Sequence, residues 1–158
     1  MSHIHELYDF TVSAFILHPN KPKLCLLKHT KLNKWFQPGG HIELNEDPLQ
    51  ALEHELFEET GLILDDCTII EPADQPNVKG QKTLPLPHLF NVHDYNGGHK
   101  HIDMEFLVRS NTETFSPQEN ESQRIEWFNK DQIRILHSEG DMFDGTLDIC
   151  EWLFSNHM

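Results

Sequence analysis

Apolar residues recur along the chain in two spacings, one typical of β-strands and one typical of α-helices. Alternating or continuous apolar runs predict strands over six segments: Tyr8–Leu17, Leu24–Leu27, Leu62–Ile70, Leu89–Tyr95, His99–Arg109 and Arg124–Phe128. A turn rich in proline and asparagine, His18–Pro22, joins the first two strands into a hairpin. The tripeptide Asn96–Gly98 joins the fourth and fifth strands in the same way.

Helix signals occur at three places in the sequence. The best marked helix has Asp47 as its N-cap, Pro48 at its first position and Gln50 completing a capping box. Gly61 predicts its end, and an apolar stripe predicts the face that packs, formed by Leu49, Leu52 and Leu56. A second helix is expected to begin at Asn129. A third begins near Asp144 and turns four residues inward: Leu147, Cys150, Leu153 and Phe154.

The segment Glu71–Pro87 carries four prolines, at positions 72, 76, 85 and 87. Proline cannot donate a backbone hydrogen bond, so we expect a surface loop rather than a helix or a central strand. A long ordered loop could gate access to a site, or it could be an excursion without a direct role. The sequence leaves both open.

The first predicted helix carries three glutamates on one face, Glu55, Glu58 and Glu59. Like charges at this spacing destabilise an isolated helix, so their presence calls for a compensating partner. Carboxylate oxygens are ligands that Mg²⁺ and Mn²⁺ prefer, which makes a divalent cation the simplest partner. The competing interpretation is a solvated helix face.

The segment Gly40–Leu62 resembles the signature of the Nudix hydrolases, G-x5-E-x7-R-E-U-x-E-E-x-G-U, where U is a bulky apolar residue. The matching positions are Gly40, Glu46, Glu55, Leu56, Glu58, Glu59, Gly61 and Leu62. The preceding Pro38-Gly39 is also typical of the family. One position departs from the pattern, because His54 stands where the family has arginine.

The family's arginine resembles a partner that orients a glutamate of the signature. His54 lies four residues before Glu58 and could hydrogen-bond it, though through one ring nitrogen and with a charge only when protonated. We therefore expect a working site that is weaker or more sensitive to pH than usual.

The resemblance implies a single α/β domain over residues 1–158, an α/β/α sandwich whose mixed β-sheet lies between the first and last helices. It also implies hydrolysis of a diphosphate linkage in a nucleoside diphosphate linked to another group. Substrates of the nucleoside triphosphate type and of the ADP-ribose or sugar-nucleotide type remain open. The alternative is a Nudix-fold module that binds or senses a nucleotide without cleaving it.

The implied metal ligands for Mg²⁺ or Mn²⁺ are Gly40, through its carbonyl, together with Glu55, Glu58, Glu59 and Glu121. The last of these lies in an acidic loop before a tryptophan-containing strand, where several family members supply a further carboxylate, and Glu119 is the second candidate. Either Glu55 or Glu121 could act as the general base.

A row of polar residues, His101, Asp103 and Glu105, alternates with apolar residues along the predicted strand His99–Arg109. We expect this row to form a further wall of the same site. Four histidines crowd the region: His88, His93, His99 and His101. Their spacing matches no structural zinc pattern, so contacts to substrate or scattered surface histidines compete with a Zn²⁺ site.

Composition narrows the range of partners. The chain has 158 residues, enough for one domain, and a net charge of −14, which argues against a broad basic surface for a nucleic-acid polymer. A small phosphorylated molecule bridged by metal ions is the expected substrate. Three cysteines without metal-binding spacing and no membrane-spanning run favour a cytoplasmic location. The oligomeric state is open, with a homodimer among the possibilities.

Overall fold

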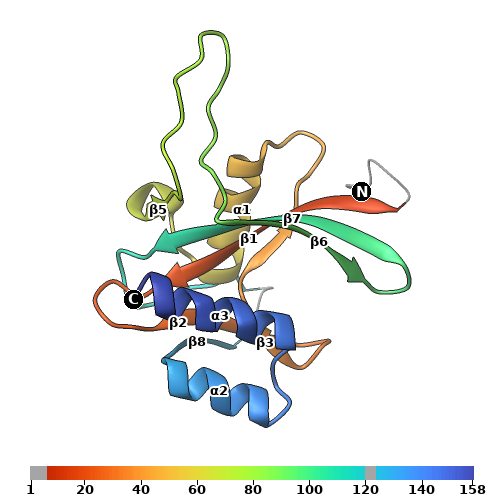
Figure 1. Ribbon diagram of the computed structural model, residues 1–158, viewed down its shortest axis with the longest axis vertical. Coiled ribbons are helices and arrows are strands. Elements are labelled where there is room, and N and C mark those ends of the chain that lie inside the picture. The colour runs from red at the N-terminus through yellow and green to blue at the C-terminus, as the bar shows by residue number, and fades with distance from the viewer. Residues whose placement is uncertain (1–6, 120–123) are drawn as a thin grey trace.

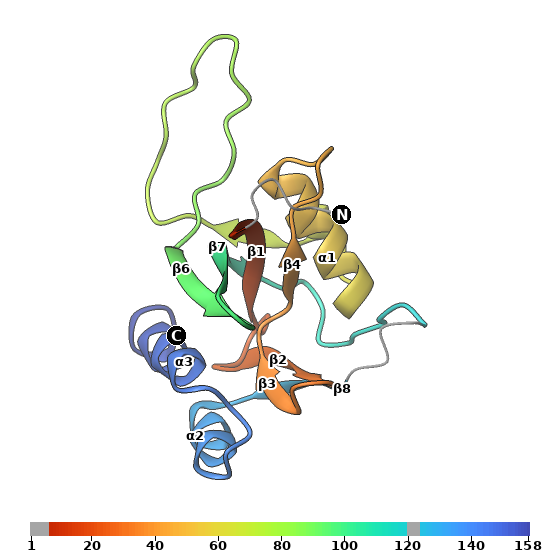
Figure 2. The ribbon, with the colours of Figure 1, turned by 90° about the vertical axis from the view of Figure 1, so that its right-hand side faces the viewer.

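The computed structural model describes residues 7–119 and 124–158 of the chain. An eight-stranded sheet forms the middle layer, and helices cover both of its faces (Figure 1). Helix α1 (Pro48–Thr60) lies on one face, while α2 (Lys130–Ser138) and α3 (Asp144–Asn156) lie on the other (Figure 2). The expected α/β/α arrangement around a mixed sheet is confirmed.

Strands β1 (Tyr8–Leu17) and β7 (His99–Arg109) form the centre of the sheet and run parallel, with Asp9 opposite His101. The other strand pairs are antiparallel, which makes the sheet mixed. Five of the other six strands are β2 (Leu24–His29) with β3 (Lys34–Phe36) and β8 (Arg124–Phe128) beside it, β5 (Thr68–Ile70), and β6 (Leu89–Tyr95). A short strand, β4 (Gly39–His41), pairs with β1 only.

The alternation of side chains on β1 and β7 divides the interior into two cores. Even-numbered residues such as Val12 and Phe106 pack against Leu52 and Leu56 of α1. Odd-numbered residues pack beneath the other two helices, in a cluster that includes Phe15, Leu17, Leu107, Ile133, Cys150 and Leu153. Each face of the sheet is therefore covered. The position of a polar residue along β1 or β7 shows whether its side chain faces α1 or faces α2 and α3.

Helix α1 has the caps that its sequence predicts. Asp47 Oδ1 accepts hydrogen bonds from the backbone amides of Leu49 (2.9 Å) and Gln50 (3.0 Å), and the Gln50 side chain accepts one from the Asp47 amide (2.9 Å). Gly61 ends the helix in the left-handed conformation, at φ 75°. The glutamate-bearing helix thus has defined ends at both its termini.

The prediction of one strand over Leu62–Ile70 is wrong in its first part. Residues Leu64–Asp66 form a 3₁₀ turn, and only Thr68–Ile70 is a strand. The turn satisfies its own backbone, since the Cys67 amide donates to the Leu64 carbonyl (2.9 Å). Leu62 and Leu64 are buried in the α1 core, so their apolar character reflects burial beside the helix rather than pairing in the sheet.

The proline-containing segment from Glu71 to Pro87 forms neither helix nor strand, as expected, and projects from the body of the protein (Figure 1). Glu71 Oε1 accepts a hydrogen bond from the Leu86 amide (2.8 Å) and closes the base of the loop. Lys82 Nζ lies 2.6 Å from Asp47 Oδ2, which ties the loop to the start of α1.

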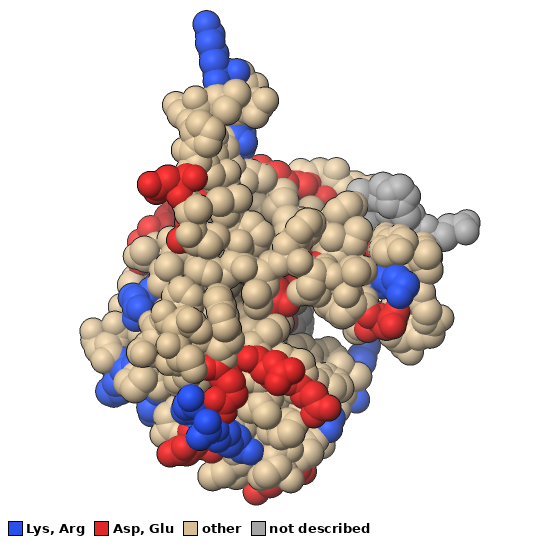
Figure 3. All heavy atoms as spheres, viewed as in Figure 1, with Lys and Arg blue, Asp and Glu red and all other residues tan. Residues whose placement is uncertain are grey.

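Charged side chains are dispersed over the face in Figure 3, where basic groups lie at the tip of the projecting loop and in separate places lower down. Acidic groups outnumber them in the chain, with 26 Asp and Glu against 12 Lys and Arg. In the described part of the chain, none of the helices has the length and apolar character of a transmembrane segment.

We predict that Gly61→Ala destabilises the fold more than Gly140→Ala does. Both glycines have positive φ, at 75° and 78°, so each alanine should cost roughly 1–2 kcal/mol. At Gly61 the added Cβ would also lie 2.2 Å from the Ser116 carbonyl oxygen, whereas nothing lies within 4 Å at Gly140. Urea unfolding of the two variants measures the difference, and equal losses would contradict the crowding at Ser116.

Candidate active site

Strand β4 brings Gly39 and Gly40 against two glutamates of helix α1. The Gly39 amide donates to Glu59 Oε2 at 2.9 Å. A Cβ built on Gly40 would lie 2.1 Å from Glu55 Oε1, so only glycine leaves room for this carboxylate. Residues separated by the loop before α1 therefore meet in one place, where the backbone of β4 lies against two carboxylates.

His54 joins two other glutamates of the segment. Its Nε2 lies 2.9 Å from Glu58 Oε1, and its Nδ1 lies 3.2 Å from Glu46 Oε1. The contact with Glu58 was predicted, and the contact with Glu46 was not. Nδ1 has no partner with hydrogen-bond geometry, so the bond to Glu58 is the stronger of the two. This bond, opposed by partial burial, raises the pKa of His54 above its ordinary value of 6.5.

The acidic loop after β7 is attached to the C-terminal end of α1. The Ser116 amide donates to the Thr60 carbonyl (2.9 Å), and the Gln118 amide donates to the Glu58 carbonyl (3.0 Å). Glu119, the second candidate, follows directly and is exposed. Glu121, the first candidate, lies outside the described residues. The attachment explains how this loop approaches the glutamates of α1.

The polar row of β7 lies on the face of the sheet away from α1, so the expectation that it forms a wall with the helix glutamates is wrong. His101, Asp103 and Glu105 are buried on the same face as Leu107, which packs beneath α2 and α3. Side chains on even-numbered positions of β7 face α1 instead. The predicted alternation along β7 is correct. It places the polar row of β7 on one face of the sheet, whereas α1 and its glutamates lie on the opposite face.

Hydroxyl and amide groups hold the two carboxyl groups of this row. Asp103 accepts from Thr11 Oγ1 and Ser13 Oγ, each at 2.9 Å, and Glu105 Oε1 accepts from Asn91 Nδ2 at 2.6 Å. Burial raises the pKa of Asp103. Burial, followed by the neighbouring Asp103 charge, raises the pKa of Glu105 to about 7. Glu105 can therefore exchange a proton near neutral pH, inside the protein.

Histidines gather at the other end of the same row, with Asp9 among them. Ligand atoms of Asp9, His41 and His101 lie within 4.8 Å of one another, and His99 Nε2 lies 2.7 Å from Asp9 Oδ2. Burial, followed by the charge of His41, lowers the pKa of His101 to about 4. Asp9 and His41 escaped the sequence analysis because strand pairing, which has no local spacing, brings them to His101.

His88 does not join this group. Its ring lies against His157 and Trp152, with ring centroids 4.8 and 6.1 Å away. Burial lowers the pKa of His88. The four histidines that the sequence placed in one region thus divide between two environments.

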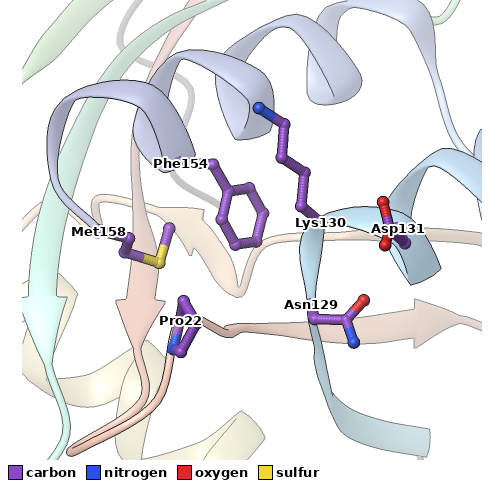
Figure 4. Close-up of a pocket in the computed structure, with 6 residues that line it drawn as sticks. All are labelled: Pro22, Asn129, Lys130, Asp131, Phe154 and Met158. Atoms are coloured by element: carbon purple, nitrogen blue, oxygen red, sulfur yellow. The ribbon is translucent and has the colours of Figure 1, made fainter.

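A shallow hollow lies where the start of α2 meets the end of α3 (Figure 4). Its lining residues are Pro22, Asn129, Lys130, Asp131, Phe154 and Met158. Lys130 Nζ pairs with Glu151 (3.1 Å), and none of the sequence-predicted site residues lines the hollow. It is a junction between helices and is not part of the candidate active site.

A mixed α/β fold with a glutamate-bearing helix against two glycines of a strand is the arrangement expected of a phosphoanhydride hydrolase with this signature. The NUDIX domain model matches residues 7–147, and the chain therefore belongs to the Nudix family. The family assignment made from the signature is confirmed.

Relatives with assigned names cover the chain to different extents. The chain is 28% identical over 100 residues to "Probable DHNTP pyrophosphohydrolase" of Lactococcus lactis, which covers 63% of this chain and 54% of that protein. It is 26% identical over 143 residues to an m7GpppN-mRNA hydrolase of Danio rerio, which covers 84% and 45%. The chain thus spans about half the length of these curated relatives.

Among solved structures, a NUDIX family hydrolase from Clostridium perfringens has a TM-score of 0.78 and 30% sequence identity. The match covers 93% of this chain and 96% of that one. The whole architecture described above, including the helices on both faces, is therefore shared with a member of the family.

We predict that His54 stabilises the fold more at low pH than at high pH. Its pKa is raised in the folded state, so the stabilisation is complete below about 6.5 and is lost as pH rises through the folded-state pKa. Urea unfolding of wild type, His54→Ala and His54→Arg at about pH 5.5 and about pH 8.5 tests this. The deficit of His54→Ala should shrink at the higher pH, whereas His54→Arg should hold its stability relative to His54→Ala at both. A deficit independent of pH would exclude an ionic role.

We predict that Glu105→Gln stabilises the protein relative to wild type, and that this gain grows as pH rises. The sign is opposite to that expected for His54→Ala. Because the pKa of Glu105 is raised from 4.5 to about 7, its burial costs stability that develops as pH rises through 4.5 and is complete above about 7, and a neutral amide keeps the Asn91 contact without that charge. The gain in unfolding free energy should approach on the order of 2–3 kcal/mol near pH 9 and vanish near pH 4. The exposed Glu139→Gln is the matched control. Equal pH profiles for the two variants would contradict the prediction.

Proposed function

We propose that this protein hydrolyses a diphosphate linkage in a nucleoside diphosphate linked to another group, with Mg²⁺ or Mn²⁺ as its cofactor. The observation that carries the proposal is the meeting of Glu55 and Glu59 with Gly39 and Gly40 of strand β4. Family membership supports the reaction class, since named relatives include pyrophosphohydrolases. It leaves the particular substrate to experiment.

The residues where β4 meets α1 fit a hard divalent cation. Gly40 has no side chain to fill the space that the Glu55 carboxylate occupies, and all the proposed donors are oxygens. Glu55, Glu58, Glu59 and the Gly40 carbonyl would hold the ion. When bound, the ion would neutralise phosphate charge and polarise the phosphorus centre.

Each residue then has a separate task. Glu59 is fixed by the Gly39 amide, so its second carboxylate oxygen keeps a defined direction. His54 holds Glu58 against Glu46 and limits the rotation of that side chain. In the reaction, the oxygen of a water molecule bonds to phosphorus, the bridging P–O bond breaks, and a carboxylate takes the proton from that water. Glu55 and Glu121 remain the two candidates for this base.

Two observations guide the choice of substrates to test: the acidic charge of the chain and the substrates that appear in the names of its relatives. The acidic chain disfavours contact with a long polyanion, which supports a small phosphorylated molecule. Some relatives are named RNA pyrophosphohydrolase or m7GpppN-mRNA hydrolase, so the 5′ end of an RNA also belongs in a substrate panel. The panel is a nucleoside triphosphate, ADP-ribose and a 5′-triphosphorylated RNA oligonucleotide.

We predict that Glu59→Gln lowers kcat on the best substrate of this panel by more than about a hundredfold. The amide keeps the shape of the side chain but loses the charge that a metal ion requires. Glu53→Gln, an exposed change on the same helix, is the matched control and should retain wild-type rates. Product release is measured with Mg²⁺ or Mn²⁺ and again after chelation.

Two outcomes would overturn parts of this proposal. Wild-type rates for Glu59→Gln would remove Glu59 from the site. Nucleotide binding by wild type without product release, for every member of the panel and with both metals, would favour the alternative of a binding or sensing module. The first outcome concerns one residue, and the second concerns the function itself.

A further inference from the structure

Three adjacent strands bring Asp9, His41 and His101 to one point of the sheet. Asp9 of β1 pairs with His101 of β7, and His41 of β4 pairs with Thr11, two residues along β1. One ligand atom from each of the three residues lies within 4.8 Å of the other two. We propose that these residues form a second metal site, which takes a first-row transition-metal ion such as Zn²⁺.

This site is separate from the glutamates of α1. Neighbouring residues on a strand point to opposite faces, and a Cβ on Gly40 would point at Glu55 of α1. The His41 side chain therefore points to the other face, where Asp9 and His101 lie. The two sites share strand β4 and lie back to back across it.

Burial favours a ligand at this point. His101 is 8% exposed, and its Nε2 is buried without a hydrogen-bond partner among the described residues. A buried polar atom without a partner costs free energy, and a bound cation would remove that cost. Asp9 is 1% exposed and supplies negative charge beside the ring nitrogen. A cation would thus satisfy the His101 nitrogen, next to a carboxylate that already contacts His41 and His99.

The donor set selects the kind of metal. Two imidazoles and one carboxylate suit Zn²⁺ and its neighbours, whereas Mg²⁺ prefers oxygen ligands alone. Bonds of about 2.0–2.1 Å in a tetrahedral site place ligand atoms about 3.3 Å apart, so small side-chain rotations would complete the site. Three protein ligands leave one position for water or an added ligand, on the side where His41 is 38% exposed.

Surrounding groups hold these ligands in place. His99 Nε2 lies 2.7 Å from Asp9 Oδ2 and restrains the carboxylate. The Tyr95 ring stacks on the His101 ring, with centroids 4.4 Å apart. Residues in such positions around metal sites orient the ligands and raise affinity. These contacts restrain the ligand side chains, which distinguishes the group from a set of scattered surface histidines.

Equilibrium dialysis of the untagged full chain with Zn²⁺, in an excess of Mg²⁺ that occupies oxygen-only sites, tests the proposal. We expect one Zn²⁺ per chain that Mg²⁺ does not displace. His41→Ala and Asp9→Asn should each weaken Zn²⁺ binding by at least about tenfold. His137→Ala, which removes a histidine paired with Asp144 elsewhere on the surface, is the matched control and should bind like wild type.

A second measurement guards against loss of fold and against binding at the other site. Long-range ¹H–¹⁵N spectra should show Zn²⁺-induced shifts for the rings of His41 and His101 in wild type, and circular dichroism should show that the variants fold. Unchanged Zn²⁺ affinity in folded His41→Ala and Asp9→Asn would overturn the proposal. So would a loss of Zn²⁺ binding in Glu58→Gln alone, because that result would place the ion at His54 and the α1 glutamates.

Discussion

The close approach of helix α1 to the two glycines of strand β4 is the contact on which the candidate active site depends. Gly40 and the Glu55 carboxylate occupy adjoining space, and the Gly39 amide holds Glu59. Any side chain at Gly40 would separate the helix from the strand or displace the carboxylate. The approach is possible because Leu52 and Leu56 are buried in the core between α1 and the sheet, which fixes the distance from the helix to the sheet.

The sheet keeps two different chemistries apart. Oxygen donors gather on the α1 side, where we propose a hard divalent cation, whereas imidazoles gather on the opposite face around Asp9 and His101. Side-chain alternation alone produces this separation, since Gly40 and His41 are neighbours in the chain. The buried carboxyl groups of Asp103 and Glu105 continue the second face toward α3.

His54 shows how a departure from the family pattern is accommodated. An arginine at this position could bond two carboxylates with its guanidinium group, and the two nitrogens of one imidazole reach Glu46 and Glu58 instead. Both carboxylates are contacted, but the charge of His54 depends on pH, and the bond to Glu58 raises the pKa of His54 above its ordinary value of 6.5. The substitution therefore converts a constant interaction into one that titrates.

Local signals in the sequence determined the elements and most of the proposed metal ligands. Asp47 and Gly61 set the ends of α1, because a capping side chain and a left-handed glycine act within a few residues. The same helix orders Glu55, Glu58 and Glu59 by its own periodicity. Where local signals compete with burial, as at Leu64, the prediction of a strand was wrong.

Tertiary structure alone decided which faces meet. The parallel pairing of β1 with β7 places Asp9 beside His101, although they are 92 positions apart in the sequence and no spacing rule links them. It also moves the polar row of β7 away from the glutamates of α1, which the sequence could not reveal because alternation identifies two faces without saying what covers each. Contacts between distant segments carry that information, and they exist only in the folded chain.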